Sequence, residues 1–235
     1  MMVRLDKYLA DLGAGTRSEV KNGIRKGRAA VDGRIVKRPE EKIDADLCRV
    51  TYDGIPIAYR KWVYYMMNKP AGVVSAVKDH KERTVLDLLD GWKRKGLFPA
   101  GRLDKDTEGL LIITNDGDLA HRMLSPGKHV DKVYYAHILG NVSAEDAAAF
   151  AAGIDIGDDK PTLPAKLEIL SADEVSEVMV TIHEGRYHQV KRMFLALGKQ
   201  VIYLKRTAMG SLLLDQTLAP GEYRELTKEE IKQLC

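Results

Sequence analysis

One short apolar run limits the folds open to this chain of 235 residues more than any other feature. Residues 110–114 read Leu-Leu-Ile-Ile-Thr, and an unbroken run of this kind is typical of a strand buried on both faces. Residues 115–117 (Asn-Asp-Gly) then favour a turn. Asp104 and Asp106 precede the run, so we expect both acids in a loop at the mouth of the core. Loops on rigid elements often carry the chemistry of a protein, which makes these two acids candidates.

Length and charge indicate two parts with different tasks. A chain of 235 residues with 45% hydrophobic composition suits one domain of ordinary size plus a small one. The net charge is only +3, but between Arg17 and Arg38 eight basic residues stand against two acids, Glu19 and Asp32. This imbalance predicts an anionic partner for the N-terminal part.

Cysteine usage and hydropathy exclude several classes of protein. Two cysteines, Cys48 and Cys235, are too few for a disulfide framework and lack the spacing of metal ligands. The first ten residues carry charges where a signal peptide needs an apolar stretch, and no apolar run reaches the length of a membrane span. We therefore expect a reduced, cytoplasmic protein without a metal site or a membrane partner.

The first sixty residues predict two helices followed by a hairpin. Thr16 and Glu19 have the spacing of a capping box, so a second helix begins there, and Gly27 can end it. Asp32-Gly33 between β-branched residues is a strong signal for a two-residue hairpin turn. The first helix follows from the helical spacing of Leu5, Tyr8, Leu9 and Leu12.

Basic residues recur along one face of the second predicted helix. The spacing of four, four and three residues places them on the side opposite Val20 and Ile24. A row of charges on a surface helix is often only solvated, and that alternative stays open. Eight basic residues in a small module favour a polyanion, which offsets their mutual repulsion. The four basic residues of this helix face are Arg17, Lys21, Arg25 and Arg28.

The remaining residues predict strands and helices in irregular order, which favours an α+β fold. The helix expected over residues 184–198 has an apolar face of Val190, Met193, Phe194 and Leu197. Its opposite face presents His188, Lys191 and Arg192 to a loop acid or a phosphate, with a surface salt bridge as the alternative. The other expected elements are strands over 62–67, 129–140, 166–170 and 177–182, helices over 118–124 and 143–152, and a loop over 155–166.

Common catalytic motifs are missing from the sequence. Neither glycine spacing of the phosphate-binding loops occurs, and His183 and His188 are five residues apart, which does not suit a zinc protease pair. The cysteines lack a plausible catalytic partner. Carboxylates surrounded by basic residues are what remains.

Two resemblances extend this interpretation. Residues 4–13 (RLDKYLADLG) and 16–39 (TRSEVKNGIRKGRAAVDGRIVKRP) resemble the RNA-binding domain of ribosomal protein S4. NKPAG at 68–72, GRLDKDTEGLLIITNDG at 101–117, DKVYY at 131–135 and EGRYHQVKRMF at 184–194 resemble the ribosomal RNA pseudouridine synthases of the RsuA family, in that family's order. The resemblances imply an RNA-binding domain over 1–60 and a catalytic domain over 61–235, built on a mixed, largely antiparallel sheet with a central cleft.

The resemblance also implies an activity and roles for residues. The family detaches uracil from its ribose, rotates it and rejoins it through carbon five, without a cofactor or metal. Asp104 stands at the position of the essential aspartate, which either attacks the sugar or removes a proton from it. Lys191 stands where the family has a basic partner, Tyr134 where a tyrosine stacks on the flipped base, and Arg102 where an arginine helps to open the RNA. The residues expected to bind RNA are Arg102, Arg17, Lys21, Arg25, Arg28, Arg34, Lys69, Lys132, Arg186 and Arg192.

The expected substrate is 16S ribosomal RNA. Tyr187 and His188 stand where large-subunit relatives more often carry asparagine and arginine, which favours the small-subunit branch. The partner would be ribosomal RNA or a small-subunit assembly intermediate, bound by a monomer. Two alternatives are the same chemistry on 23S RNA and a non-catalytic ribosome-assembly factor; the intact set of Asp104, Tyr134 and Lys191 argues against the second.

Overall fold

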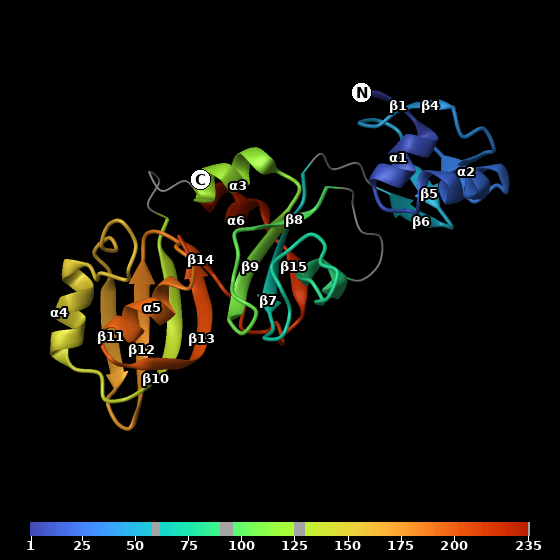
Figure 1. Ribbon diagram of the computed structural model, residues 1–235. Coiled ribbons are helices and arrows are strands. Elements are labelled where there is room, and N and C mark those ends of the chain that lie inside the picture. Colours follow the sequence, from blue (N-terminus) through green and yellow to red (C-terminus); the bar gives the residue numbers. More distant parts are fainter. Residues whose placement is uncertain (58–61, 90–95, 125–129, 235) are drawn as a thin grey trace. The chain divides into compact units, whose positions relative to one another are not determined.

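The computed structural model describes residues 1–57, 62–89, 96–124 and 130–234, in two compact units (Figure 1). The first unit comprises the described residues of Met1–Val63 and Leu89–Leu97, and the second those of Tyr64–Leu88 and Phe98–Cys235. The boundary expected between residues 60 and 61 lies outside the described residues and stays a prediction. In the described part of the chain, no helix has the length and apolar character needed to cross a membrane.

Local signals set the start of the first unit. Thr16 and Glu19 cap α2 reciprocally: the Glu19 amide donates to the Thr16 hydroxyl at 3.3 Å, and the Thr16 amide donates to the Glu19 carboxylate at 2.7 Å. Asp32 and Gly33 turn the hairpin with φ of 50° and 80°. Both predictions are confirmed. The elements are β1 (Met2–Arg4), α1 (Leu5–Asp11), α2 (Arg17–Arg25), β2 (Ala29–Val31), β3 (Arg34–Val36), β4 (Lys42–Asp44), β5 (Val50–Tyr52) and β6 (Ile55–Ile57).

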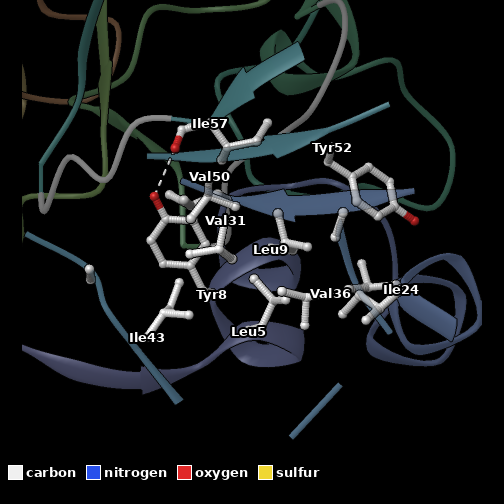
Figure 2. Packing of buried hydrophobic residues seen from close by; sticks show 14 residues of the cluster. Leu5, Tyr8, Leu9, Ile24, Val31, Val36, Ile43, Val50, Tyr52 and Ile57 are labelled. Carbon is white, nitrogen blue, oxygen red and sulfur yellow. Dashed lines mark hydrogen bonds between the residues drawn. The ribbon is translucent and has the colours of Figure 1, made fainter. Parts of the chain in front are cut away.

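The predicted helix faces form the core of this unit, together with strands that the sequence analysis missed (Figure 2). A four-stranded sheet runs in the order β3-β2-β5-β6, and β1 pairs with β4. Asp53-Gly54, with φ of 54° and 77°, turns a second hairpin by the same chemistry as Asp32-Gly33. The Tyr8 hydroxyl donates to the Ile57 carbonyl at 2.8 Å and so ties α1 to β6.

The second unit is built on a nine-stranded sheet, which confirms the α+β class. Its main order is β11-β12-β10-β13-β9-β7-β15, while β14 pairs with β13 and β8 with β9. The strands are β7 (Tyr64–Lys69), β8 (Phe98–Ala100), β9 (Glu108–Thr114), β10 (Lys132–Leu139), β11 (Lys166–Ser171), β12 (Val175–Ile182), β13 (Gln200–Met209), β14 (Leu212–Leu213) and β15 (Tyr223–Glu225). The helices are a 3-10 turn (Val85–Leu88), α3 (Gly117–Leu124), α4 (Ala144–Ala152), α5 (Gln189–Ala196) and α6 (Lys228–Gln233).

Strand β9 is an inner strand of the sheet and is buried from Gly109 to Thr114, as its apolar run predicts. Among the described strand pairs of this sheet, only β9–β13 is parallel, and it joins Glu108 and Gly109 to Lys205 and Arg206. β7 occupies one edge of β9 over 109–114, so β13 at 108–109 and β8 at 112–114 share the other edge. β13 and β8, which follow each other along this edge of β9, therefore part from each other next to Gly109.

The predicted end of strand β7 and the predicted start of helix α5 are wrong, because contacts with other parts of the fold set both. Strand β7 continues through Asn68 and Lys69, because both pair with β9, and ends only at Pro70, which has no amide hydrogen. Helix α5 begins at Gln189 rather than near 184. The turn before it is held by the Gln189 side chain, which accepts a hydrogen bond from the Arg186 amide at 2.9 Å.

Helices α4 and α5 cover one face of the β10–β13 region (Figure 1). α4 packs on β11 and α5 on β13, and the Phe150 and Phe194 rings meet with centroids 4.9 Å apart. Val190, Met193 and Phe194 are buried, which confirms most of the predicted apolar face of α5, while Leu197 is half-buried. The first turn of α5, with Lys191, lines the cleft beside β13 and β8.

We predict that Gly109→Ala weakens the second unit. Gly109 has φ of +99°, and a Cβ at this position would lie 2.2 Å from the Arg206 carbonyl oxygen. Backbone strain and forced separation of β9 from β13 should lower the free energy of unfolding by about 2 kcal/mol or more. Urea denaturation measures this loss. Gly117→Ala is the control, because a Cβ at residue 117 would meet only open space, and this variant should stay near wild type; equal stability of the two variants would contradict the prediction.

Candidate active site

A cleft of about 720 Å³ opens where β13 and β8, both paired with β9, part from each other. It receives Pro99 from β8 and Leu204 and Arg206 from β13. This is the central cleft that the resemblance implied. Among the described residues, no cluster of three His, Cys, Asp or Glu side chains is arranged to hold a metal ion. Six basic and two acidic side chains line the cleft. They are Arg102, Lys105, Lys132, Arg186, Lys191 and Arg206, and Asp79 and Asp104. This surplus of cations suits a polyanionic ligand.

The loop that carries Asp104 is anchored through its backbone on both sides. Before Asp104, the Ser75 hydroxyl donates to the Leu103 carbonyl at 2.9 Å and accepts from the Leu103 amide at 3.0 Å. After Asp104, the Lys69 ammonium donates to the carbonyls of Lys105 at 3.3 Å and Thr107 at 2.7 Å. Because these anchors use only backbone groups of the loop, the Asp104 carboxylate is left to other partners.

Lys69 is therefore corrected from an expected RNA contact to a loop anchor. Its side chain is fully buried, and a third carbonyl, that of Pro70, accepts from it at 3.0 Å. Burial lowers the pKa of Lys69 to about 8, although the nearby carboxylates of Asp106 and Asp104 act in the opposite direction. A phosphate has no access to a buried ammonium whose hydrogen bonds go to three carbonyls.

Asp104 and Lys191 meet across the cleft, as the face of the predicted helix suggested. Lys191 Nζ lies 3.1 Å from Asp104 Oδ2 and 2.5 Å from Asp106 Oδ1. Burial would lower the pKa of Lys191, but the hydrogen bonds to Asp106 and Asp104 outweigh it and raise that pKa. Lys191 remains charged over the physiological range as a result. Asp106, read from the sequence as an acid of the loop, is 73% exposed and shares this cation.

His188 is the second residue whose side-chain nitrogen lies close to the Asp104 carboxylate. Its Nε2 lies 3.6 Å from Asp104 Oδ1, and its backbone is left-handed, with φ of 48° and ψ of 35°. The ring stacks on Tyr187 with centroids 3.8 Å apart and planes inclined by 16°. His188 and Lys191 thus approach different oxygens of the Asp104 carboxylate.

Tyr134 lies opposite Arg206 in the β10–β13 ladder, and both side chains line the cleft. Tyr134 and Lys132 are buried, as alternate residues of β10 on one face. Lys132 donates to the Val130 carbonyl at 3.1 Å, and burial together with the positive charge of Arg206 lowers the pKa of Lys132. The cleft wall beside Tyr134 thus carries two buried cations.

Arg206 is a residue that the sequence analysis missed. It is 2% exposed, and its Nε donates to the Leu110 carbonyl at 2.8 Å. Among the described residues, no acceptor meets its Nη2. A signal existed in the sequence, since an arginine at an inward position of the strand Gln200–Met209 breaks the apolar alternation.

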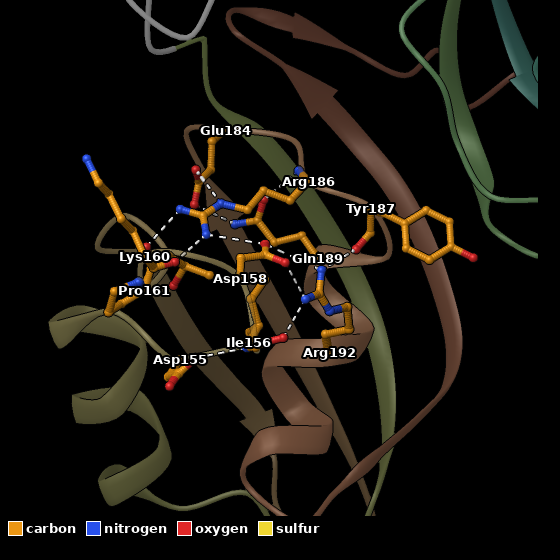
Figure 3. A network of polar contacts seen from close by, with 12 residues as sticks. Asp155, Ile156, Asp158, Lys160, Pro161, Glu184, Arg186, Tyr187, Gln189 and Arg192 are labelled. Carbon is orange, nitrogen blue, oxygen red and sulfur yellow. Dashed lines mark hydrogen bonds and ion pairs between the residues drawn. The ribbon is translucent and has the colours of Figure 1, made fainter.

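Arg186 and Arg192, both expected to bind RNA, fasten the loop over 155–161 to the start of α5 (Figure 3). Arg186 donates to the Lys160 carbonyl at 2.6 Å and the Pro161 carbonyl at 2.8 Å. Arg192 pairs with Asp158 at 2.5 Å and also donates to the Ile156 carbonyl. Their guanidinium groups are occupied within the protein, and direct contact with RNA stays a prediction.

The other expected RNA contacts differ in their partners. Arg102 is exposed at the cleft and has no acidic partner among the described residues. Lys21 and Arg25 also lack one in the described part of the chain, whereas the three other residues of the first unit that were expected to bind RNA have one. Those pairs are Arg17 with Asp6 at 3.5 Å, Arg28 with Asp53, and Arg34 with Glu41 at 2.5 Å.

Comparisons with known proteins agree with this geometry. Residues 63–196 match the family of RNA pseudouridylate synthases, and residues 3–46 match the S4 domain. "Uncharacterized RNA pseudouridine synthase YtzG" of Bacillus subtilis is 51% identical over 99% of this chain and 98% of its own length. "Ribosomal small subunit pseudouridine synthase A" of Escherichia coli is 43% identical over 97% and 98%. A solved structure described as a pseudouridylate synthase has a TM-score of 0.70 and 40% identity, and covers 99% of this chain and 100% of that one.

The lowered pKa of Lys69 predicts a specific dependence of stability on pH. Lys69 titrates at about 8 in the folded chain and near its ordinary 10.5 when unfolded. Between these values the unfolded chain binds more protons, so the free energy of unfolding rises with pH. Measured by urea denaturation from pH 7 to 10.5, the stability of wild type minus that of Lys69→Met should increase by about 3 kcal/mol. A difference that stays flat over this range would refute the burial argument.

Proposed function

We propose that this chain, which belongs to the RNA pseudouridylate synthase family, isomerises a uridine of 16S ribosomal RNA to pseudouridine. Relatives from Escherichia coli and Vibrio cholerae named for the small ribosomal subunit are 43% and 44% identical over nearly their whole length, which supports this substrate. The observation that carries the proposal is the contact of Asp104 with Lys191 at 3.1 Å in a cleft rich in cations.

Asp104 is the proposed catalytic carboxylate. It either attacks the ribose or removes a proton from it, and in both routes it must be ionised at the start. Lys191 places a positive charge beside this carboxylate, with its Nζ 3.1 Å from Asp104 Oδ2. The glycosidic bond between the ribose and nitrogen one then breaks. The bond from the ribose to carbon five forms as Asp104 leaves the sugar or returns the proton that it removed. Carbon five loses its proton to solvent and nitrogen one takes one up, so the reaction needs no redox partner.

Tyr134 and the cations beside it would serve the detached base. A uridine within a stack hides its reacting atoms, so it must be flipped out, and an aromatic ring offsets part of that cost. Tyr134 is the proposed ring. Uracil leaves the sugar with the electrons of the broken bond, and the buried charges of Lys132 and Arg206 would stabilise this electron-rich base.

The N-terminal unit is proposed to hold the ribosomal RNA. Its match to the S4 domain supports this role. On the basic face of α2, Lys21 and Arg25 have no acidic partner in the described residues, whereas Arg17 and Arg28 have one. We propose a cytoplasmic monomer with an RNA-binding domain over residues 1–60 and a catalytic domain over 61–235. Ribosomal RNA, free or in an assembling small subunit, would be its partner.

We predict that Asp104→Asn abolishes turnover while RNA binding survives, because the reactive charge is lost and the shape is kept. Asp106→Asn is the matched control: it lies two residues away, contacts the same lysine and should retain activity. The assay is tritium release from 16S transcripts labelled at carbon five of uridine, with 23S transcripts alongside. Substantial release by Asp104→Asn would sink the mechanism, and release from 23S alone would overturn the proposed substrate. Binding of wild type without any release would instead favour an assembly factor.

A second prediction concerns the contacts of α2 with phosphates. Replacing Lys21 and Arg25 together by alanine should weaken RNA binding and reduce the slope of log affinity against log salt by roughly 1.5. Filter binding over a range of salt concentrations measures the slope. Replacing Lys7 and Lys42, exposed lysines of the same unit, removes the same charge and should leave the slope nearly unchanged. Equal slopes for both double variants would show that α2 is merely a solvated face.

A further inference from the structure

Tyr187 presents an aromatic ring to solvent at the edge of the cleft. It is 74% exposed and belongs to the cleft lining. In Figure 3 its ring points away from the network of Arg186 and Arg192. One face of the ring is covered by His188, at 3.8 Å between centroids. Neither anchoring of the loop nor pairing of Asp104 with Lys191 uses this ring.

The backbone around Tyr187 is fixed from several sides. His188 adopts a left-handed conformation, which costs free energy for any residue other than glycine. The Tyr187 carbonyl accepts a hydrogen bond from Arg192 Nη1 at 3.2 Å, and the Arg186 amide donates to the Gln189 side chain at 2.9 Å. The stacked pair of Tyr187 and His188 is thus a preformed platform rather than a loose side chain.

The position of the Tyr187–His188 platform beside Asp104 indicates which part of the RNA it can contact. Its His188 edge lies 3.6 Å from the Asp104 carboxylate, so the free face of Tyr187 is one ring further from the reacting sugar. Tyr134 belongs to β10, on a different wall of the same cleft. Arg102, exposed in the lining, attracts a phosphate backbone, and flat aromatic faces bind unpaired bases irrespective of their sequence.

We propose that the Tyr187–His188 platform stacks on a second, unpaired base of the substrate RNA, next to the flipped uridine. This proposal rests on the proposed function, since it takes Asp104 as the place of the reacting nucleotide. The platform adds affinity and sets the path of the strand; it takes no part in bond making or breaking. RNA that offers a stackable base beside the uridine is the ligand it recognises.

The test compares Tyr187→Ala with Tyr187→Phe and with Leu195→Ala, an exposed residue of α5 that does not line the cleft. Filter binding and single-turnover tritium release are measured on the 16S transcript. Loss of a stacked base should weaken binding by Tyr187→Ala roughly 5- to 100-fold. Its rate at saturating enzyme should stay within about twofold of wild type, and its salt slope should not change, because no phosphate contact is removed. Tyr187→Phe and Leu195→Ala should bind like wild type.

A second arm identifies the base. Once the modified uridine is mapped, each flanking nucleotide is replaced by an abasic one. The abasic site at the stacked position should weaken wild type and leave Tyr187→Ala unaffected, as expected when both changes remove the same contact.

Unchanged binding by Tyr187→Ala, or an equal loss in Tyr187→Phe, would overturn the stacking proposal. So would an abasic penalty that is the same in wild type and Tyr187→Ala at both flanks. If wild type binds the transcript but releases no tritium, the proposed function fails, and the platform is then decided by the binding of Tyr187→Ala and Tyr187→Phe alone.

Discussion

The arrangement of the site depends on the parallel contact between β9 and β13. It spans only Glu108 and Gly109 on one strand and Lys205 and Arg206 on the other, and it requires a residue without a Cβ at Gly109. The Arg206 side chain reinforces it through the Leu110 carbonyl. β9 continues directly from the Asp104 loop, and β13 follows α5, which carries Lys191. Joining these two strands therefore brings together an acid and a cation that lie far apart in the sequence.

Positioning and chemistry are assigned to different groups around Asp104. Ser75 and Lys69 hold the loop through its carbonyls and amides, so no anchor competes for the carboxylate. Lys191 and His188 approach that carboxylate from the start of α5, where the left-handed residue redirects the chain. A buried lysine bound to neutral carbonyls costs stability, as its lowered pKa records. In return, the same ammonium holds the loop on the C-terminal side of Asp104.

Patterns within a few residues of sequence predicted the local elements. The buried run of β9, the Thr16 capping box and the Asp32-Gly33 turn depend on neighbours in the chain, and all three are confirmed. The contacts of Ser75 with Leu103 and of Arg206 with Leu110 join distant segments, and no local pattern encodes them. The helix pattern offered Lys191 to a loop acid, but only the resemblance named Asp104 as that acid. The hairpin at Asp53-Gly54 was predictable by the rule applied to Asp32-Gly33, and was missed.

Burial separates the basic residues that RNA can reach from those it cannot. Exposed pairs such as Arg28 with Asp53 exchange partners readily, because water and salt weaken them in any case. Lys69 cannot do so, since leaving its carbonyls would strand buried acceptors. Composition alone does not distinguish an exposed cation such as Arg28 from a buried one such as Lys69, since each counts as one positive charge. Among the residues expected to bind RNA, Lys21, Arg25 and Arg102 have no acidic partner in the described part of the chain, so they carry the strongest argument for binding a phosphate backbone.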